Sequence, residues 1–549
     1  MKPQRQGARR IRCDVRTAAI KSLVVTAMLA ALGWTNPSAA QAQAGERSSR
    51  APELEGGREW LNADRPLRIH EELKGQVVLL DFWTYCCINC MHVLPDLAYL
   101  EKKYKDEPFI VIGVHSAKFQ NEAEAKNIRS AILRYEIKHP VIVDDNMAIW
   151  RRYGVRSWPT LVVVDPAGQV VGSIPGEGHR ALLDNVVQRI LDEHRAKGTL
   201  AKAPLRLIRE RLAPPESGLR FPGKVLADAD NKRLIISDSN HNRIVIATWP
   251  GPDGGAKLIR TIGNGQVGRT NGPPEKARFN HPQGMALDGN TLFVADTENH
   301  LIRRVSLTTG RVRTLAGTGK QSGDRAGGKR GRRQGLNSPW DLEVNKQWLY
   351  IAMAGPHQLW RIDRRSNRCE AFVGSGRENI LDGSMANAQL AQPSGLALAG
   401  NQLYFADSEV SAIRVADLEA GQVRTLIGKG LFDFADVDGT YPSARLQHCL
   451  GVTLWGDKLL VADTYNHKIK IIDPVKRAST TLLGTGKAGL GTPGATLELY
   501  EPGGLDFAAG VLFVADTNNH RIVRIDPETK QWAVVTIEGL TAPPVDDPE

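Results

Sequence analysis

Cysteine is scarce in this chain, since only six occur among 549 residues. A small disulfide-stapled scaffold carries a far higher proportion, so that class of protein is excluded. Three of the six, Cys86, Cys87 and Cys90, crowd into one motif, which indicates chemistry rather than stapling. Cys369 and Cys449 lie 80 residues apart, and we favour two buried free thiols over a bridge between them.

Long hydrophobic runs are also missing. The marked apolar run, residues 23–34, is shorter than the roughly 20 residues that a membrane span needs. Basic residues precede it, and small residues that offer Ala-x-Ala-like cleavage choices follow it, so residues 1–44 predict a signal peptide. We expect an exported, periplasmic protein with no stable membrane span after cleavage, and retention as an uncleaved anchor is the less favoured alternative. Arg9-Arg10 leaves the choice between Sec and twin-arginine export open.

A strong excess of positive charge is absent from the mature part. The formal net charge is +11, but the signal segment holds seven basic residues and one acid, a net +6, so +5 remains. No basic stripe interleaved with aromatic residues accompanies this small excess. The sequence therefore gives no reason to expect a nucleic-acid partner.

The most informative stretch lies between a strand pattern and a helix pattern. Residues 77–82 form an apolar run typical of a buried strand, and apolar residues recur at helical spacing from Met91 onward. This places Cys87 at a helix N-terminus, where free N–H groups and the helix dipole stabilise a thiolate. A thiolate is the nucleophile of disulfide exchange, and Cys90, one turn later, can resolve the mixed disulfide.

A lone Cys-x-x-Cys can also be half of a zinc site. The sequence has no second pair, and His92 is too close to Cys90 to complete a four-ligand set comfortably. We therefore favour a redox pair, and we expect neither a metal nor an organic cofactor.

The N-terminal half divides by composition and periodicity. Residues 45–65 are mostly polar and are expected to be a flexible lead-in. Strand and helix patterns alternate over residues 66–195, which predicts a sheet covered by helices. The strand patterns are 77–82, 109–114, 141–143, 161–164 and 170–171, and the helix patterns are 90–104, 122–135 and 181–195. The proline-containing residues 196–220 are expected to be a linker with a short strand at 205–208.

Beyond residue 220 the chain repeats itself. An Asp-Ser or Asp-Thr pair follows an apolar strand five times, and Met353-Ala354 holds the same place in a degenerate copy. The pairs begin at Asp238, Asp296, Asp407, Asp463 and Asp516. One copy shows four short strand patterns, at 284–287, 292–295, 302–306 and 312–316. Six copies of four strands predict a six-bladed β-propeller over residues 221–540.

The repeated polar residues admit two interpretations. Some propellers are hydrolases or lyases, so these Asp, Asn and His side chains invite a catalytic one. Because they recur in register, we favour a structural role in turns and in hydrogen bonds between blades. Each copy is longer than a WD-type propeller blade, and we expect the additional residues in loops. One such loop begins at Asp382-Gly383 and another at Asp438-Gly439.

By these motifs, residues 66–195 resemble the thioredoxin superfamily, closest to its exported TlpA-like branch. Residues 221–537 resemble NHL repeats, whose Asn-His pair occurs at Asn240-His241, Asn299-His300, Asn466-His467 and Asn519-His520. The resemblance implies that Cys87 is the attacking cysteine and Cys90 the resolving one. It also implies that Asp81 relays a proton for Cys90, that Pro95 bends the helix, and that Pro159 is the cis-proline facing the disulfide.

The motif departs from the family pattern in two ways. Tyr85-Cys86 precedes the pair where the family usually has Trp, and Ile88-Asn89 replaces the usual Gly-Pro. That dipeptide tunes the reduction potential, so the direction of electron flow stays open. Cys86 is a possible auxiliary thiol, although an adjacent, partly buried bystander is the favoured interpretation.

Together these observations predict an exported thiol–disulfide oxidoreductase in which the propeller recruits a protein or peptide client that carries a thiol or disulfide. Such a protein also needs a redox partner protein. Two alternatives remain: a redox-inactive binding scaffold built on the propeller, and a propeller enzyme that acts on a small molecule.

Overall fold

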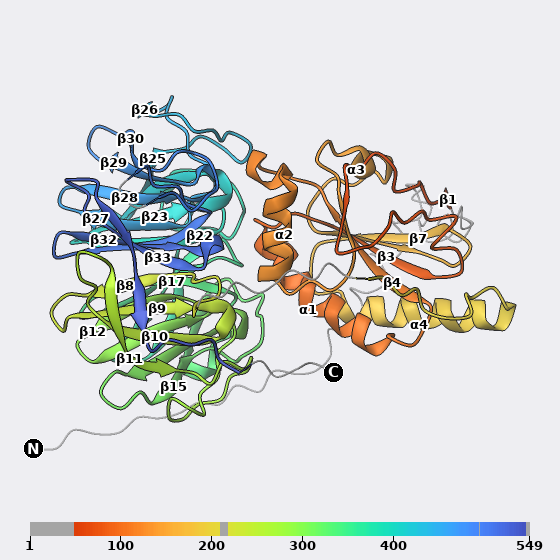
Figure 1. Cartoon of the computed structure of the whole chain (residues 1–549), viewed down its shortest axis with the longest axis horizontal. Coiled ribbons are helices and arrows are strands. Elements are labelled where there is room, and N and C mark those ends of the chain that lie inside the picture. The colour runs from red at the N-terminus through yellow and green to blue at the C-terminus, as the bar shows by residue number, and fades with distance from the viewer. Residues whose placement is uncertain (1–48, 209–217, 493–494, 545–549) are drawn as a thin grey trace, which may run out of the picture. The chain divides into compact units, whose positions relative to one another are not determined.

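The computed structural model describes residues 49–208, 218–492 and 495–544. The predicted signal peptide, residues 1–44, lies outside this part. The chain forms a thioredoxin-like α/β domain followed by a six-bladed β-propeller, as the sequence predicts (Figure 1). Within the described residues, the helices fall short of the length and apolar character that a bilayer crossing needs.

A seven-stranded sheet with the order β1-β7-β6-β3-β4-β5-β2 organises residues 49–208, the first described stretch. Its central strands β3, β4 and β5 are parallel, whereas β6 runs antiparallel to β3. The strands are β1 (Ser49–Arg50), β2 (Trp60–Leu61), β3 (Val77–Trp83), β4 (Phe109–His115), β5 (Val141–Val143), β6 (Thr160–Val164) and β7 (Gln169–Pro175). The helices are α1 (Ile88–Lys103), η1 (Gln120–Ala123), α2 (Ala125–Arg134), α3 (Ala148–Arg152) and α4 (Arg180–Lys197).

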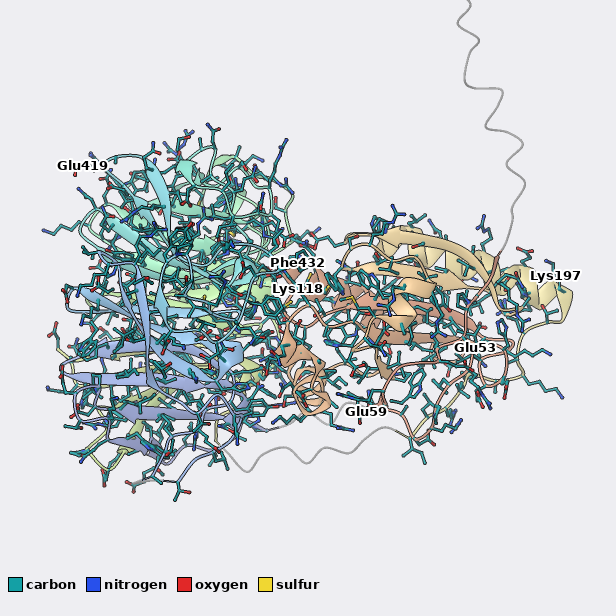
Figure 2. All side chains as sticks on the ribbon, turned by 90° about the horizontal axis from the view of Figure 1, so that it is seen from above. Glu53, Glu59, Lys118, Lys197, Glu419 and Phe432 are labelled. Carbon is teal, nitrogen blue, oxygen red and sulfur yellow. The ribbon has the colours of Figure 1, made fainter. Side chains whose placement is uncertain are left out.

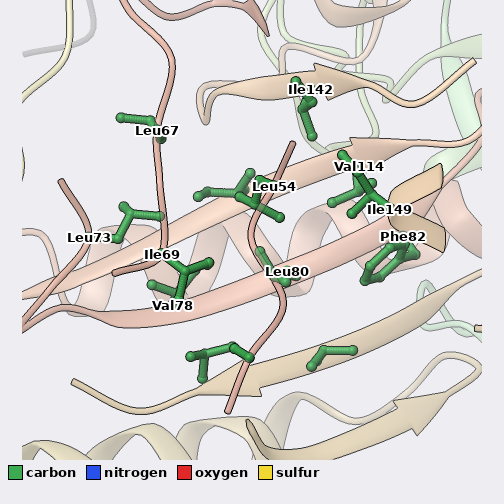
Figure 3. Packing of buried hydrophobic residues seen from close by; sticks show 14 of the residues in the cluster. Leu54, Leu67, Ile69, Leu73, Val78, Leu80, Phe82, Val114, Ile142 and Ile149 are labelled. Atoms are coloured by element: carbon green, nitrogen blue, oxygen red, sulfur yellow. The ribbon is translucent and has the colours of Figure 1, made fainter. Parts of the chain in front are cut away.

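Strand β3 is apolar except for Asp81, because both of its faces are covered. Val78, Leu80 and Phe82 pack into the cluster drawn in Figure 3. Val77 and Leu79 point to the opposite face, where they pack against residues of α1 and α4. Successive side chains of a strand alternate between faces, so Asp81 falls on the face that carries α1.

Two expectations for the ends of this domain are wrong. The segment 45–65 was expected to be flexible, but its described part forms β1 and β2, and its apolar residues Ala51, Leu54 and Leu61 are buried. Residues 205–208 form no strand; Leu205 and Leu207 instead pack against the first hydrophobic cluster. In both segments a few apolar side chains anchor a polar stretch, which average composition does not reveal.

Six sheets follow one another within residues 218–492 and 495–544. In each, four consecutive strands are antiparallel, and the clearest repeat has its strands where the sequence predicts them. The first three blades are β8 (Val225–Asp228), β9 (Arg233–Asp238), β10 (Arg243–Thr248) and β11 (Gly255–Ile262); β12 (Pro282–Asp288), β13 (Thr291–Asp296), β14 (Leu301–Ser306) and β15 (Val312–Ala316); and β17 (Pro339–Val344), β18 (Trp348–Met353), β19 (Gln358–Asp363) and β20 (Arg368–Val373).

The last three blades repeat this plan. They are β22 (Pro393–Ala399), β23 (Gln402–Asp407), β24 (Ala412–Asp417) and β25 (Gln422–Ile427); β27 (Gly451–Trp455), β28 (Lys458–Asp463), β29 (Lys468–Asp473) and β30 (Ala478–Leu483); and β31 (Pro502–Ala508), β32 (Val511–Asp516), β33 (Arg521–Ile525) and β34 (Trp532–Val534). Short outer strands extend four of the sheets, namely β16 (Gly327–Arg330), β21 (Gly383–Ser384), β26 (Gly439–Thr440) and β35 (Thr536–Glu538). Two of these, β21 and β26, come from the Asp-Gly loops that the sequence singled out.

The repeated aspartates serve the fold. In five blades the carboxylate at the end of the second strand accepts a backbone N–H from the loop that enters the blade, as in Asn280 to Asp296 at 2.8 Å. The following hydroxyl donates to a carbonyl of the next blade in four cases, including Thr517 to Pro222 across the ring closure at 2.9 Å. These contacts support a structural role, rather than a catalytic one, for the repeated Asp, Ser and Thr residues.

One of the four Asn-His pairs is out of register. The left-handed residue that ends the short helix after each aspartate is His300, His467 or His520 in three blades, but Asn242 in the first blade. His241 therefore occupies the place of Asn299, and each of them bonds to its own blade's aspartate.

Candidate redox site

Cys87 is the N-cap of helix α1. Its backbone is extended, with φ −80° and ψ 115°, and its sulfur accepts the N–H of Cys90 at 3.4 Å. This is the placement that the sequence predicts, with a helix N-terminus beneath the sulfur. Cys87 is partly exposed, whereas Cys90 is 1% exposed, and both are free thiols. The helix continues through the exposed Pro95.

The buried Cys90 is a poor acid. Burial raises its pKa well above the usual range, and the hydrogen bond to Cys87 and the charges of Cys87 and Asp81 raise it further. A buried thiol that is held protonated is suited to resolve a mixed disulfide rather than to begin one.

Asp81 lies fully buried in β3, between Gly113 of β4 and Leu161 of β6. Burial raises its pKa to about 7, although the charge of His139 opposes the shift. Neither carboxylate oxygen has a hydrogen-bond partner among the described residues. An unpartnered buried acid that titrates near neutrality can take up and return a proton.

Pro159 immediately precedes β6, and the Trp158–Pro159 peptide bond is cis. The Trp158 indole N–H donates to the carbonyl of Ser116 at 2.9 Å. Trp158 and Cys87 are both partly buried, and both pack against the hydrophobic cluster that contains Cys86 and Cys90. The structure thus gathers Trp158, the residue before the predicted proline, and all three cysteines around one cluster.

Cys86 is fully buried, and burial together with the charges of Glu122 and Glu409 raises its pKa well above the usual range. Its backbone N–H donates to Glu122 Oε1 at 2.8 Å, and its sulfur lies 3.9 Å from Thr84 Oγ1. These surroundings favour the bystander interpretation of Cys86. The other pair, Cys369 and Cys449, consists of buried free thiols, as expected.

His92, considered as a zinc ligand, is engaged elsewhere. Its ring nitrogens lie 2.6 Å from Glu177 Oε2 and 2.7 Å from Ser338 Oγ. Among the described residues, no three His, Cys, Asp or Glu side chains gather as a metal ion requires.

Sequence reasoning missed the contribution of the propeller to this site. In each blade one residue with positive φ precedes the innermost strand, and its N–H donates to a side chain of the preceding blade. We call these six the rim residues: Phe221, His281, Ser338, Gln392, His448 and Glu501. A proline follows five of them in the sequence, and that repeated x-Pro pair was the available signal.

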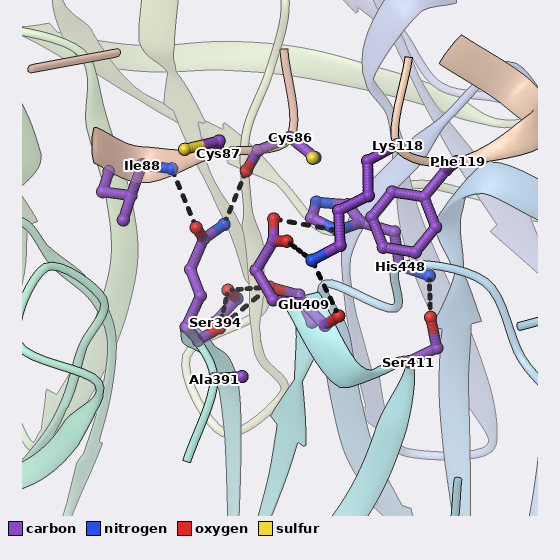
Figure 4. Close-up of polar contacts among 12 residues, drawn as sticks. Cys86, Cys87, Ile88, Lys118, Phe119, Ala391, Ser394, Glu409, Ser411 and His448 are labelled. Carbon is purple, nitrogen blue, oxygen red and sulfur yellow. Dashed lines mark hydrogen bonds and ion pairs between the residues drawn. The ribbon is translucent and has the colours of Figure 1, made fainter. Parts of the chain in front are cut away.

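Several rim residues contact the thioredoxin-like domain directly. Glu501, which is 1% exposed, accepts hydrogen bonds from Tyr85 Oη at 3.0 Å, Asn121 Nδ2 at 2.8 Å and Arg134 Nη1 at 3.2 Å. Gln392 bonds to the backbone of Cys86 and of Ile88, on both sides of Cys87. Figure 4 labels these three residues of the cysteine loop. The propeller is therefore built into the surroundings of the cysteines.

A cavity of about 630 Å³ lies where these two parts meet. Ile88, Met91 and His92 of α1 line it on one side, and Trp340 and the rim residues line it on the other. It is therefore adjacent to the helix turn that carries the cysteines.

Comparison with known proteins agrees with this architecture. Residues 75–170 match the thioredoxin-like family, and residues 279–304 match the NHL repeat. The chain is 46% identical over 522 residues to the Protein SUPPRESSOR OF QUENCHING 1, chloroplastic, of Arabidopsis thaliana; the match covers 91% of this chain and 49% of the plant protein. The chain thus spans about half the length of that relative.

Two further relatives cover different parts of the chain. NHL repeat-containing protein 2 of Gallus gallus is 41% identical over 529 residues, which are 90% of this chain and 72% of the bird protein. The Thiol-disulfide oxidoreductase YkuV of Bacillus subtilis is 27% identical over 143 residues, which are 26% of this chain and 94% of the bacterial protein. The first match spans both domains, and the second concerns the thioredoxin-like domain.

Proposed function

The chain belongs to the family of NHL repeat-containing protein 2, and on that premise we propose that it is an exported, periplasmic thiol–disulfide oxidoreductase whose propeller recruits a protein client. Its thioredoxin-like domain resembles thiol–disulfide oxidoreductases. The observation that carries the proposal is the position of Cys87 at the N-cap of α1, with its sulfur 3.4 Å from the Cys90 N–H.

The proposed reaction begins with attack of the Cys87 thiolate on a client disulfide. A bond forms between Cys87 and one client sulfur, and the other client sulfur leaves as a thiolate. Asp81 then accepts the proton of Cys90, whose sulfur attacks Cys87 and releases the second client thiolate. The client gains two electrons, and the chain is left with a Cys87–Cys90 disulfide that a redox partner protein must reduce. In an oxidant, the same steps run in reverse.

The propeller supports client recruitment through a loop beside the site. The loop between β25 and β26 carries Phe434, which packs against the cluster around the cysteines, and Phe432, which is 70% exposed. Lys118 lies next to Phe432 in Figure 2, with its Nζ 5.5 Å from the centre of that ring. An exposed aromatic ring on a loop that also packs against the cysteine cluster offers a contact to an unfolded or extended client.

Insulin reduction by dithiothreitol tests the proposal. The full chain should accelerate insulin precipitation, and Cys87→Ser should abolish that acceleration because serine is no nucleophile in disulfide exchange. Cys449→Ser, which changes a buried thiol far from the motif in sequence, is the matched control and should keep the activity.

Acceleration that survives Cys87→Ser would contradict the proposal. A full chain that gives no acceleration would favour the redox-inactive scaffold, and acceleration that survives Cys87→Ser but is abolished by chelators would favour a propeller enzyme.

A further inference from the structure

The side chain of Gln392, in the propeller, hydrogen-bonds to the backbone on both sides of Cys87. Its Oε1 accepts the N–H of Ile88 at 2.8 Å, and its Nε2 donates to the carbonyl oxygen of Cys86 at 2.8 Å. The side chain is 1% exposed, so water does not compete for either bond. One carboxamide thus satisfies two backbone groups whose peptide units enclose Cys87.

Three hydrogen bonds within the propeller fix the backbone of Gln392. Its N–H donates to His357 Nδ1 at 3.1 Å, and its carbonyl oxygen accepts the hydroxyls of Ser394 at 2.7 Å and Ser408 at 2.8 Å. The backbone of Gln392 is therefore held in place while its side chain contacts the cysteine loop. A residue that positions another group must itself be fixed in this way.

Glu122 holds the same loop from within the thioredoxin-like domain. Its Oε1 accepts the N–H of Cys86 at 2.8 Å, and its Oε2 accepts the hydroxyl of Thr84 at 2.7 Å. The segment from Cys86 to Ile88 is thus fixed from two sides, one of them supplied by the propeller. Among the rim residues, Gln392 is the one that bonds to this backbone.

We propose that Gln392 is a positioning residue of the Cys87–Cys90 pair, so that the propeller completes the redox site. The inference rests on the proposed function and deepens it. A disulfide forms only within a narrow range of backbone and sulfur geometry. Holding the reduced loop close to that geometry removes freedom that ring closure would otherwise cost, which stabilises the disulfide relative to the dithiol.

Redox titration of the full chain in glutathione buffers tests this role. In the reaction, the protein dithiol reduces glutathione disulfide to two glutathione molecules and becomes the Cys87–Cys90 disulfide. Gln392→Met keeps the side-chain length but removes both hydrogen bonds. We expect the equilibrium constant for disulfide formation to fall about tenfold, which corresponds to a reduction potential about 30 mV higher. Disulfide is counted by mass spectrometry after alkylation of free thiols.

The matched control is Ser338→Ala at the rim position of the preceding blade. It removes the hydrogen bond to His92 but leaves the backbone around Cys87 untouched, so the equilibrium constant should stay within twofold of the wild-type value. If thermal unfolding shows that Gln392→Met does not fold, Gln392→Asn replaces it, because its shorter carboxamide cannot span both groups. The same tenfold fall is expected.

The inference is overturned if the substitution at Gln392 leaves the equilibrium constant unchanged, or if Ser338→Ala shifts it as much. A wild-type chain that titrates normally but does not reduce insulin contradicts the proposed function alone. A wild-type chain that forms no Cys87–Cys90 disulfide in any buffer overturns both.

Discussion

At the scale of the residue, burial distinguishes two otherwise identical thiols, and the roles that we propose for them follow from that difference. Cys87 is partly exposed at a helix N-terminus, and Cys90 lies beneath it with a raised pKa. In the proposed reaction the resolving thiol needs a base, and we assign that role to Asp81, whose pKa is raised by burial to about 7.

The first prediction concerns Asp81. Below pH 7 its carboxyl group is mostly protonated and cannot accept the proton of Cys90; above pH 7 it is a carboxylate and can. The rate of resolution should therefore rise with pH through about 7. In Asp81→Asn this rise should disappear, and the rate at pH 8 should fall about a hundredfold.

Stopped-flow release of thionitrobenzoate from its mixed disulfide with Cys87 measures this step. Asp96→Asn, on α1 and paired with Arg180, is the control and should keep the wild-type profile. A wild-type profile in Asp81→Asn would show that another group accepts the proton.

The residues of the candidate site differ in how far the sequence could predict them. The Cys-x-x-Cys pair between a strand and a helix is a local signal, and the family resemblance added Asp81 and Pro159. Glu122 carried no such signal, because an acid in a helix pattern is common, and the repeated x-Pro pair marks Gln392 as a rim residue without indicating what its side chain contacts. Their importance arises only when the folded chain brings them to the cysteine loop.

At the scale of the element, the blades were the most predictable part. Each apolar strand pattern repeats about every 55 residues, and turn residues bound it, so the strands could be placed without tertiary information. The helix pattern over residues 122–135 was less reliable. The structure divides it into η1 and α2, because Glu124 is extended and Glu122 turns inward to bind the backbone of Cys86 and Phe119.

The prediction at this scale concerns the hydrogen bonds that join the last blade of the propeller to the first. The first sheet includes β35 from the C-terminal end, which pairs with β11, and side-chain contacts such as Thr517 Oγ1 to Pro222 O add to the closure of the ring. Thr517→Val removes this buried hydrogen bond without changing the side-chain volume much. We expect a loss of about 1 kcal/mol and a fall of about 2 °C in the melting temperature.

Differential scanning calorimetry measures that change. Thr308→Val, at an exposed position of the second blade, makes the same chemical substitution and should leave the melting temperature unchanged. Equal effects of the two substitutions would mean that the Thr517 bond does not contribute to closure.

At the scale of the whole molecule, the rim residues join the two domains. Glu501, Gln392 and Ser338 come from three blades, and their side chains reach Tyr85, the Cys86–Ile88 backbone and His92, respectively. Sequence analysis could not anticipate these contacts, because positions about 55 residues apart become neighbours only when the ring closes. It therefore treated the domains as separate units joined by a linker.

Client recruitment gives the prediction at this scale. If Phe432 contacts a protein client, Phe432→Ser should raise the KM for insulin about tenfold, since it removes an apolar contact of a ring that is 70% exposed. The rate with a small aromatic disulfide, which is too short to reach that loop, should not change.

The control for this substitution is Val475→Ser, because Val475 is 87% exposed in the turn between β29 and β30 of the same propeller. It should affect neither substrate. An unchanged KM in Phe432→Ser would show that the client does not use this loop.

The central claim is that Cys87 is the attacking nucleophile of a Cys87–Cys90 pair, and trapping tests it most directly. The full-length Cys90→Ala chain is incubated with glutathione disulfide, digested and analysed by mass spectrometry. Because no resolving thiol remains, the account predicts one stable glutathione adduct, on Cys87, and an unmodified Cys86. An adduct on Cys86 instead, or none on either residue, would contradict it.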